Sequence, residues 1–546
     1  MISRSILVNF NSLPSSLDSL MPDNGLINLS ASLNRAGHQT LILDFCTVSY
    51  IKHLITDEIH KELAEAYFEL NKDRKKLSEI LPIFKNIFKK LENRKQEVIN
   101  EYINKRVCDK ISDFDPHFVG FKLWSGEGFL GCIEIAKMIK KRFPKIKLIA
   151  GGPHNDFFHE HTFDFTDVFD ILAYGECEET IVDLAQWSVG RKELDQINNI
   201  IYKKNGSAVR TPLKRVEDLD ESAEPIYDPG IYPSLIGNEK VNVIMIDESR
   251  GCPNNCHFCP HPKKSGRKWR KRNPDNVVKI IKDAKTKLNT YCFRLAGSNP
   301  PADLMEDICK RIIANNLNIH FVAFGHGVND SGEYYHLLKK AGCSSLFFGV
   351  ESGNREILRD VMNKRVSPDR MKEAILKCKS ASIGTTASVI VPAPGETLKS
   401  LYDTYQFLVD TSPDGVSLCM PGVFPGAEWY INKEKYGLEL ADDYFPRMMA
   451  YTIRFMMPPP LWDPFPFTID GKDFTQQMIL GDFLNTSLEK KGILTGINDV
   501  TLLFAQIFGL SIPQMRDLNR EMFITGNAQK IEESVIQFNR AVSAGC

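Results

Sequence analysis

The stretch Ser249-Arg-Gly-Cys-Pro-Asn-Asn-Cys-His-Phe-Cys259 decides how this chain is organised. It places Cys252, Cys256 and Cys259 on one short loop, with three residues between the first two and two between the last two. Thiolates are soft ligands that select iron–sulfur clusters or zinc. A closed electron-transfer cluster uses four cysteines, whereas three leave one iron of a four-iron cluster open to a substrate. The loop therefore predicts an open 4Fe-4S cluster.

Zinc is the alternative metal for this loop. Cys256-x-x-Cys259 is half of a zinc knuckle, and His257 or His261 could supply a further ligand. A structural zinc site usually draws on two such pairs, and no second Cys-x-x-Cys occurs in the chain. The spacing thus favours the cluster over zinc.

The composition limits the other classes of protein. A chain of 546 residues has room for about three or four domains. Its net charge of −1 argues against a dedicated nucleic-acid binder. No apolar run reaches the ~18 residues of a membrane span, and the N-terminus is more typical of a first strand than of a signal peptide. The 13 cysteines lack the spacing of a disulfide framework, so we expect a cytoplasmic protein without membrane segments.

Six strand–helix units accompany the cysteine loop over residues 239–424. The predicted strands cover residues 241–247, 291–295, 319–324, 344–350, 384–391 and 415–420. Strands that alternate with helices pair in parallel through right-handed crossovers. Six such units predict a partial (β/α)6 barrel, whose chemistry lies at the carboxyl ends of its strands.

Residues 1–195 show a second alternation and predict a Rossmann-like, doubly wound α/β sheet. Its predicted strands cover residues 5–10, 39–45, 118–124, 145–151 and 170–175. A charged helical insertion over about 56–110 predicts a helical hairpin at the edge of the sheet. Residues 196–238 contain four prolines and predict a linker.

The remaining residues, 425–546, lose the alternation and end in helical patterns, which predicts a mostly helical C-terminal cap. The stretch 445–467 is rich in aromatic residues and methionine. Such residues form either ordinary core or, alternatively, the wall of a substrate cavity.

A basic run, Lys263-Lys-Ser-Gly-Arg-Lys-Trp-Arg-Lys-Arg272, follows the cysteine loop. Seven of its ten residues are cationic. The interpretation that we favour is a solvated face at the start of a helix. The alternatives are contacts with an anionic substrate, a cofactor phosphate or a reductase partner.

Three glycine-containing loops follow predicted strands of the N-terminal half, at residues 123–128, 151–154 and 174–178. Open α/β sheets bind ligands at the carboxyl ends of their strands, and glycines let the backbone approach a bulky ligand. The loops therefore predict a binding edge, with a plain turn as the alternative for each loop taken alone.

The cysteine loop after the first strand of a six-unit barrel resembles the radical S-adenosylmethionine (SAM) superfamily. This resemblance implies that Cys252, Cys256 and Cys259 ligate a catalytic 4Fe-4S cluster whose open iron binds SAM. It also implies a set of SAM-binding residues at the strand ends: Phe258, Gly297, Ser298, Glu351, Ser352 and Val391.

Together, the N-terminal loops resemble the cobalamin-binding domain that precedes the barrel in one radical SAM subclass. The implied cobalamin-binding residues are Ser125, Gly126, Glu127, Gly151, Gly152, Pro153, His154, Tyr174, Gly175, Glu176 and Glu178. Cys177 stands where this subclass has a second glycine, and the chain lacks Asp-x-His-x-x-Gly. The resemblance therefore implies base-off cobalamin without a protein histidine ligand, and His154 is interpreted as a hydrogen-bonding loop residue.

The subclass implies a methyltransferase that uses a 5′-deoxyadenosyl radical and methylcobalamin to methylate an unactivated carbon. We expect a small biosynthetic intermediate as substrate, with a peptide as alternative, and a flavodoxin- or ferredoxin-type reductant. Cyclisation, ring rearrangement and methylation at phosphorus or an sp2 carbon are alternative reactions. A cluster- or cobalamin-carrying electron-transfer module is the non-enzymatic alternative.

Overall fold

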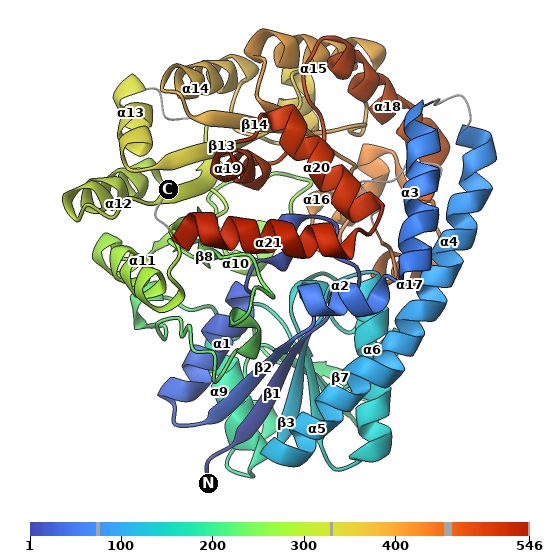
Figure 1. The fold of residues 1–546 in the computed structure, drawn as a ribbon, viewed down its shortest axis with the longest axis vertical. Helices are drawn as coiled ribbons and strands as arrows, with labels where there is room; N and C mark the ends of the chain where they lie inside the picture. The colour runs from blue at the N-terminus through green and yellow to red at the C-terminus, as the bar shows by residue number, and fades with distance from the viewer. Residues whose placement is uncertain (73–76, 328–330, 453–460, 544–546) are drawn as a thin grey trace.

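The computed structural model describes residues 1–72, 77–327, 331–452 and 461–543. Two sheets organise the chain, one in the N-terminal half and one in the middle (Figure 1). The red C-terminal helices lie across the centre of the view, where α21 (Ala528–Ser543) contacts α2 (Val48–Leu54) of the N-terminal half. No helix within these ranges is long and apolar enough to cross a membrane.

The first sheet has the strand order β2-β1-β3-β4-β5-β6-β7, and its first five strands are parallel. These strands are β1 (Arg4–Asn9), β2 (Gln39–Asp44), β3 (Phe118–Lys122), β4 (Lys147–Gly151) and β5 (Ile171–Ala173). Ile6, Leu7 and Val8 are all buried, as expected of a parallel strand covered on both faces. The helices α1 (Asn24–Arg35) and α9 (Glu178–Ser188) pack against each other beside the sheet. The predicted doubly wound sheet is confirmed.

The linker that we expected over 196–238 is wrong for its first part. The antiparallel hairpin β6 (Ile200–Lys204) and β7 (Ser207–Arg210) extends the first sheet instead. Asn205 and Gly206 both have positive φ, at 51° and 83°, as a two-residue hairpin turn requires. An Asn-Gly pair after an apolar run was the sequence signal for this hairpin.

The charged insertion is helical, as predicted. It consists of α3 (Asp57–Lys72), α4 (Leu77–Val98), the π-helical turn η3 (Ile99–Ile103) and α5 (Asn104–Phe114). The antiparallel pair α3 and α4 packs on other helices rather than on a sheet edge. α4 contacts α2, and α3 contacts α20 (Ile512–Ile524) of the C-terminal part (Figure 1).

The second sheet has the order β15-β14-β13-β12-β11-β8, with every neighbouring pair parallel. Its strands are β8 (Val243–Ile246), β11 (Cys292–Leu295), β12 (His320–Gly325), β13 (Cys343–Glu351), β14 (Gly384–Ile390) and β15 (Gly415–Cys419). The helices that follow the strands are α11 (Pro274–Leu288), α12 (Ala302–Ala314), α13 (Gly332–Lys340), α14 (Pro368–Ser380) and α15 (Leu398–Thr411). This sheet is the predicted six-unit partial barrel.

The C-terminal part is mostly helical, as predicted, and packs on both halves. Its helices are α16 (Glu428–Ile431), α17 (Tyr444–Met449), α18 (Phe474–Lys490), α19 (Asp499–Phe508), α20 and α21. A small antiparallel pair, β16 (Leu438–Leu440) and β17 (Phe467–Ile469), lies among them. α19 packs against β12, β13 and β14, and Ser345 near the start of β13 donates to the Asp499 carbonyl at 2.8 Å. α19 therefore closes the amino end of the barrel.

The aromatic and methionine-rich stretch 445–467 contributes mainly core where it is described. Met448, Met449, Tyr451, Phe465 and Phe467 are all buried. Residues 453–460, in the middle of the stretch, lie outside the described residues.

Candidate active site

The cysteine loop starts at the carboxyl edge of the second sheet, directly after β8. The short strands β9 (Ser249–Arg250) and β10 (Arg270–Lys271) pair antiparallel and bring its two ends together. Gly251 has φ +87°, and a Cβ there would lie 2.2 Å from the Lys268 carbonyl oxygen. Only glycine allows this close approach. All three cysteines are half-buried.

The middle of the loop is held by two other parts of the chain. The amide of His257 donates to the Met362 carbonyl at 2.9 Å, and the carbonyl of His257 accepts from the Trp429 amide at 3.0 Å. The Tyr436 hydroxyl lies 2.9 Å from Nδ1 of His257. Phe258 packs near Trp429, with ring centroids 5.8 Å apart. The C-terminal part thus fixes the cysteine loop from outside the barrel.

The thiols influence one another. Burial raises the pKa of Cys256 to about 11 and that of Cys259 to about 12, and the charges of the neighbouring cysteines add to both shifts. The pKa of Cys256 is also lowered by Lys364 and raised by Glu351. Cys256 and Cys259 are therefore protonated at neutral pH without metal, and a metal that binds them must release their protons.

This donor set fits an iron–sulfur cluster with one open iron. It offers three half-buried thiols at the mouth of a barrel, and Cys259 lies close enough to the other two for them to raise its pKa. Over the described residues, no three His, Cys, Asp or Glu side chains form a group that could hold a single metal ion. This holds for the three cysteines as well, so the choice between a cluster and zinc rests on the spacing of the loop.

The end of β11 adjoins the cysteine loop. The Gly297 amide donates to both carboxyl oxygens of Glu248, at 3.0 and 3.1 Å. A Cβ on Gly297 would lie 2.2 Å from Glu248 Oε1. Ser298 Oγ lies 2.8 Å from Nε2 of His261. Glu248 is fully buried and escaped sequence reasoning, although it directly precedes Ser249 at a strand end.

Glu351, at the end of β13, is also near the cysteines. Its backbone has φ +66°, at a point where the register between β13 and β14 shifts. Its carboxylate pairs with Lys364 at 3.0 Å, and both side chains are largely buried. Since both groups act on the pKa of Cys256, the pair lies beside the cysteine loop. Sequence reasoning did not find Lys364.

Two residues with predicted SAM contacts, Ser352 and Val391, have buried side chains. Ser352 is 1% exposed, lies 3.2 Å from Thr404 Oγ1 and accepts a bond from the Asn354 amide. Val391 is 2% exposed and belongs to the core between sheet and helices. Thr404, the partner of Ser352, belongs to α15. The SAM contacts at both residues stay predictions.

A cavity of about 330 Å³ joins the edge of the first sheet to the start of the second. Its apolar part lies among the first sheet, α1 and α9 and is lined by Leu7, Leu26, Leu29, Ile149, Ile181 and Leu184. Its polar part is lined by Asn24, Asn28, Asp156, Asp247, Arg250, His261, Lys264 and Ser298. Six predicted cobalamin contacts line it as well: Gly151, Gly152, Pro153, Gly175, Glu176 and Glu178. The cavity therefore gathers residues from both halves.

The loop 125–127 does not line this cavity. Ser125 is exposed, but the Gly126 amide donates to the Met449 carbonyl at 2.8 Å and the Glu127 amide donates to Thr452 Oγ1 at 3.0 Å. A Cβ on Gly126 would lie 2.6 Å from the Tyr451 carbonyl oxygen. The C-terminal part thus takes up the backbone amides of Gly126 and Glu127, and the cobalamin contacts at these residues stay a prediction.

His154 and Tyr174 are also absent from the lining of the cavity. His154 is fully buried, and its ring lies 4.0 Å from that of Phe129. Burial lowers the pKa of His154 to about 3, its Nδ1 lies 3.5 Å from Ser125 Oγ, and its Nε2 has no partner. Tyr174 is buried and donates to the Thr211 carbonyl. Neither side chain lines the cavity, and their predicted cobalamin contacts stay predictions.

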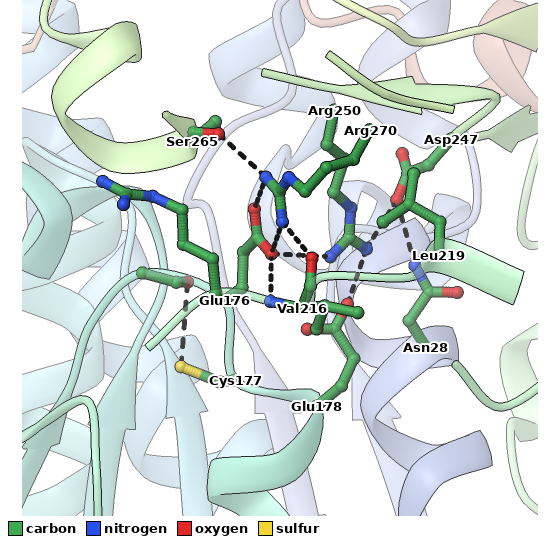
Figure 2. Close-up of polar contacts among 12 residues, drawn as sticks. Asn28, Glu176, Cys177, Glu178, Val216, Leu219, Asp247, Arg250, Ser265 and Arg270 are labelled. Carbon is green, nitrogen blue, oxygen red and sulfur yellow. Dashed lines mark hydrogen bonds and ion pairs between the residues drawn. The ribbon is translucent and has the colours of Figure 1, made fainter. Parts of the chain in front are cut away.

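The carboxylate of Glu176 forms an ion pair with Arg270 of the basic run. Its carboxylate accepts two bonds from Arg270, at 2.6 and 2.7 Å (Figure 2). Burial opposes ionisation, yet Arg270 and Arg250 hold the pKa of Glu176 below its usual value. Arg270 and Arg272 are 8% and 5% exposed, so the solvated face that we expected for the basic run is wrong at these two positions.

Residues 248–408 match the model of the Radical SAM superfamily. The chain is 25% identical over 327 residues to an uncharacterized methyltransferase of Pyrococcus horikoshii, covering 58% of this chain and 69% of the relative. It is 27% identical over 348 residues to the anaerobic magnesium-protoporphyrin IX monomethyl ester cyclase of Rubrivivax gelatinosus, covering 61% of each. The match thus spans less than two thirds of the cyclase.

The fold is similar to that of a solved structure, the radical SAM methyltransferase TsrM of Kitasatospora setae with cobalamin and a [4Fe-4S] cluster bound. The TM-score is 0.61 at 14% identity, over 97% of this chain and 99% of that one. The chain therefore carries a radical SAM domain, with the fold of a cobalamin-dependent radical SAM enzyme. The matched residues form a radical SAM domain, which implies an enzyme that uses a 4Fe-4S cluster and SAM.

Proposed function

We propose that the chain is a cobalamin-dependent methyltransferase that acts on an unactivated carbon of a small biosynthetic intermediate. One observation carries the proposal: a single cavity is lined by the ligand-binding edge of the first sheet and, through Ser298 and His261, by the surroundings of the cysteine loop. Two cofactors that act on one substrate need such a shared space.

Each side of this space has its own residues. Cys252, Cys256 and Cys259 would hold the cluster, and the strand ends at Gly297 and Glu351 would position SAM. When bound, the cluster with SAM would supply a 5′-deoxyadenosyl radical and cobalamin a transferable methyl group. The residues of this chain orient these groups and keep water away, because a radical exposed to bulk solvent is quenched.

The apolar part of the cavity supports a base-off cofactor. Leu26 and Leu29 of α1 face Ile181 and Leu184 of α9 across it, with the first sheet as its floor. A flat, largely apolar nucleotide base fits such a slot, which would keep the base away from cobalt. His154 is enclosed beside Phe129, so we propose that no histidine of this loop ligates the metal.

The product balance of anaerobic turnover tests the proposal. Reconstituted protein would receive labelled SAM, cobalamin, candidate metabolites and a flavodoxin- or ferredoxin-type reductant, which we propose as its electron donor. Methylation at an sp3 carbon predicts equal amounts of 5′-deoxyadenosine, S-adenosylhomocysteine and methylated product. 5′-Deoxyadenosine without S-adenosylhomocysteine would refute methyl transfer.

Cyclisation is the second candidate, because the chain is similar to an anaerobic cyclase over 61% of its length. A cyclase would form 5′-deoxyadenosine and a product of unchanged carbon count. The mass of the product therefore separates the two candidates in the same experiment.

A further inference from the structure

The two ends of the cysteine loop pair as β9 and β10, and we call this pair the neck of the loop. It carries two arginines side by side. Arg250 and Arg270 are partners in the antiparallel ladder β9–β10, and all three cysteines lie between them in sequence. Both guanidinium groups turn toward Glu176 of the β5–α9 loop, in the N-terminal half (Figure 2). Like charges this close repel each other in a buried setting, so the neck requires an anion.

Glu176 provides that anion with strong geometry. Its two carboxylate oxygens accept a forked pair of bonds from Arg270, and one of them also accepts from the Val216 amide at 3.0 Å. The same oxygen lies 3.6 Å from Arg250. Glu176 and Arg270 are each only 8% exposed. Forked, charge-assisted bonds between buried partners are the strongest of their kind.

The two arginines depend on Glu176 to different degrees. Arg250 has two further carboxylates, Glu178 at 2.5 Å and Asp247 at 3.0 Å. The other hydrogen bonds of Arg270 go to the carbonyl oxygens of Val216 and Ser265. Loss of the Glu176 charge would therefore leave the guanidinium of Arg270 buried without a carboxylate, and the neck would open at β10.

The same loop of the N-terminal half forms the wall of the cavity. Gly175, Glu176 and Cys177 all line it, as does Arg250 from the neck. A ligand that fixes the conformation of residues 175–177 therefore also fixes the position of the Glu176 carboxylate, which holds β9 and β10 together. Sequence reasoning assigned Glu176 to cobalamin directly, whereas its carboxylate oxygens are already taken by protein groups.

We propose that Glu176 is a positioning residue, which holds the neck of the cysteine loop closed and couples the three cysteines to occupation of the cavity. The proposal rests on the proposed function, in which the loop holds the cluster and the cavity takes cobalamin. Its first consequence, however, is a property of the cofactor-free chain: without Glu176, the loop opens more often and its thiols become more accessible.

Alkylation of the full-length, cofactor-free protein under reducing conditions measures this opening. N-Ethylmaleimide reacts with thiols, and peptide mass spectrometry gives a rate for each cysteine. We expect Glu176→Gln to raise the rates of Cys252, Cys256 and Cys259 by at least about tenfold, because it leaves the buried guanidinium of Arg270 without its carboxylate. The matched control is Glu179→Gln, whose carboxylate is exposed and pairs with Lys214. It should react like the wild type, and equal rates in Glu176→Gln and wild type would overturn the proposal.

Cys132 serves as an internal standard for global unfolding, since it is fully buried in the first half. It should stay protected in Glu176→Gln. If it reacts as well, Arg270→Lys replaces that variant, because it keeps the charge and loses only the fork. Faster loop cysteines with a protected Cys132 then support the proposal, and unchanged loop cysteines contradict it.

Hydroxocobalamin tests whether Glu176 couples the cysteine loop to the cavity or only stabilises the loop. In the wild type, bound hydroxocobalamin should slow alkylation of the loop cysteines. Glu176→Gln should still bind hydroxocobalamin, as measured by absorbance, but binding should no longer slow alkylation. A wild type that binds neither cobalamin nor iron would refute the proposed function. The alkylation rates of the cofactor-free protein would still test whether Glu176 holds the loop closed. A wild type that binds both, with a variant whose loop cysteines are protected equally well, would refute only the role of Glu176.

Discussion

Replacement of Gly297 by alanine tests how the end of β11 serves the site. The added Cβ would lie 2.2 Å from Oε1 of Glu248 and 2.3 Å from Oγ of Ser249, so at least one of them must move. Glu248 is fully enclosed and accepts the Gly297 amide, which leaves it little room. Overpacking costs about 1–3 kcal/mol, and a buried acceptor without its donor costs about 1–3 kcal/mol more. We therefore expect Gly297→Ala to lower the free energy of unfolding by about 2–6 kcal/mol.

The change should also weaken SAM binding. Glu248 and Ser249 lead directly into the cysteine loop, so their displacement moves the residues that would face SAM. We expect at least a tenfold higher dissociation constant, which corresponds to about 1.4 kcal/mol. Urea unfolding of the cofactor-free protein measures the first effect, and calorimetric titration of the reconstituted protein with SAM measures the second.

Ser298→Ala is the control for this experiment. Ser298 directly follows Gly297, and its replacement removes only a contact with His261 and adds no volume. Its unfolding free energy should stay within about 0.5 kcal/mol of wild type. Wild-type stability and SAM affinity in Gly297→Ala would show that the strand end is not packed as described.

Four further outcomes are expected. Burial raises the pKa of Glu248 from 4.5 to about 8, so the folded state loses stability as pH rises between these values. In urea unfolding, the free energy of unfolding of Glu248→Gln should exceed that of the wild type by an amount that grows from pH 5 to pH 8. Lys240→Met leaves Asp44, 2.6 Å away and fully buried, without its cation, which should cost about 3–5 kcal/mol in urea unfolding, while addition of Asp44→Asn should recover most of the loss. His154→Phe should keep cobalamin binding unchanged in a spectroscopic titration, since this ring is enclosed, and a lost affinity would indicate a ligand. Cys256→Ala should abolish SAM cleavage but leave cobalamin binding intact in the same titration.

The strands and the cysteine loop could be predicted because their signals are local. Each strand of the barrel is a short apolar run that can be recognised without its neighbours, and the loop is defined by its spacing. The hairpin at Asn205 and Gly206 had a local signal as well. The four prolines that follow it are typical of a linker, and the linker was predicted for the whole range 196–238.

The errors at the site concern partners far apart in sequence. Arg270 meets Glu176 across 94 positions, and Thr452 meets Glu127 across 325. Spacing along the chain carries no information about such pairs. The basic run therefore suggested a solvated surface, although Arg270 pairs with Glu176 inside the folded chain. The contacts of Gly126 and Glu127 with residues 449–452 were likewise invisible in the sequence.

The open iron is the central claim, and electron paramagnetic resonance of the reduced, reconstituted protein tests it most directly. The account predicts about four irons per chain and a cluster signal that changes when SAM is added, because SAM binds the iron that lacks a cysteine. A reconstituted protein without iron, or a cluster signal that is indifferent to SAM, would contradict it.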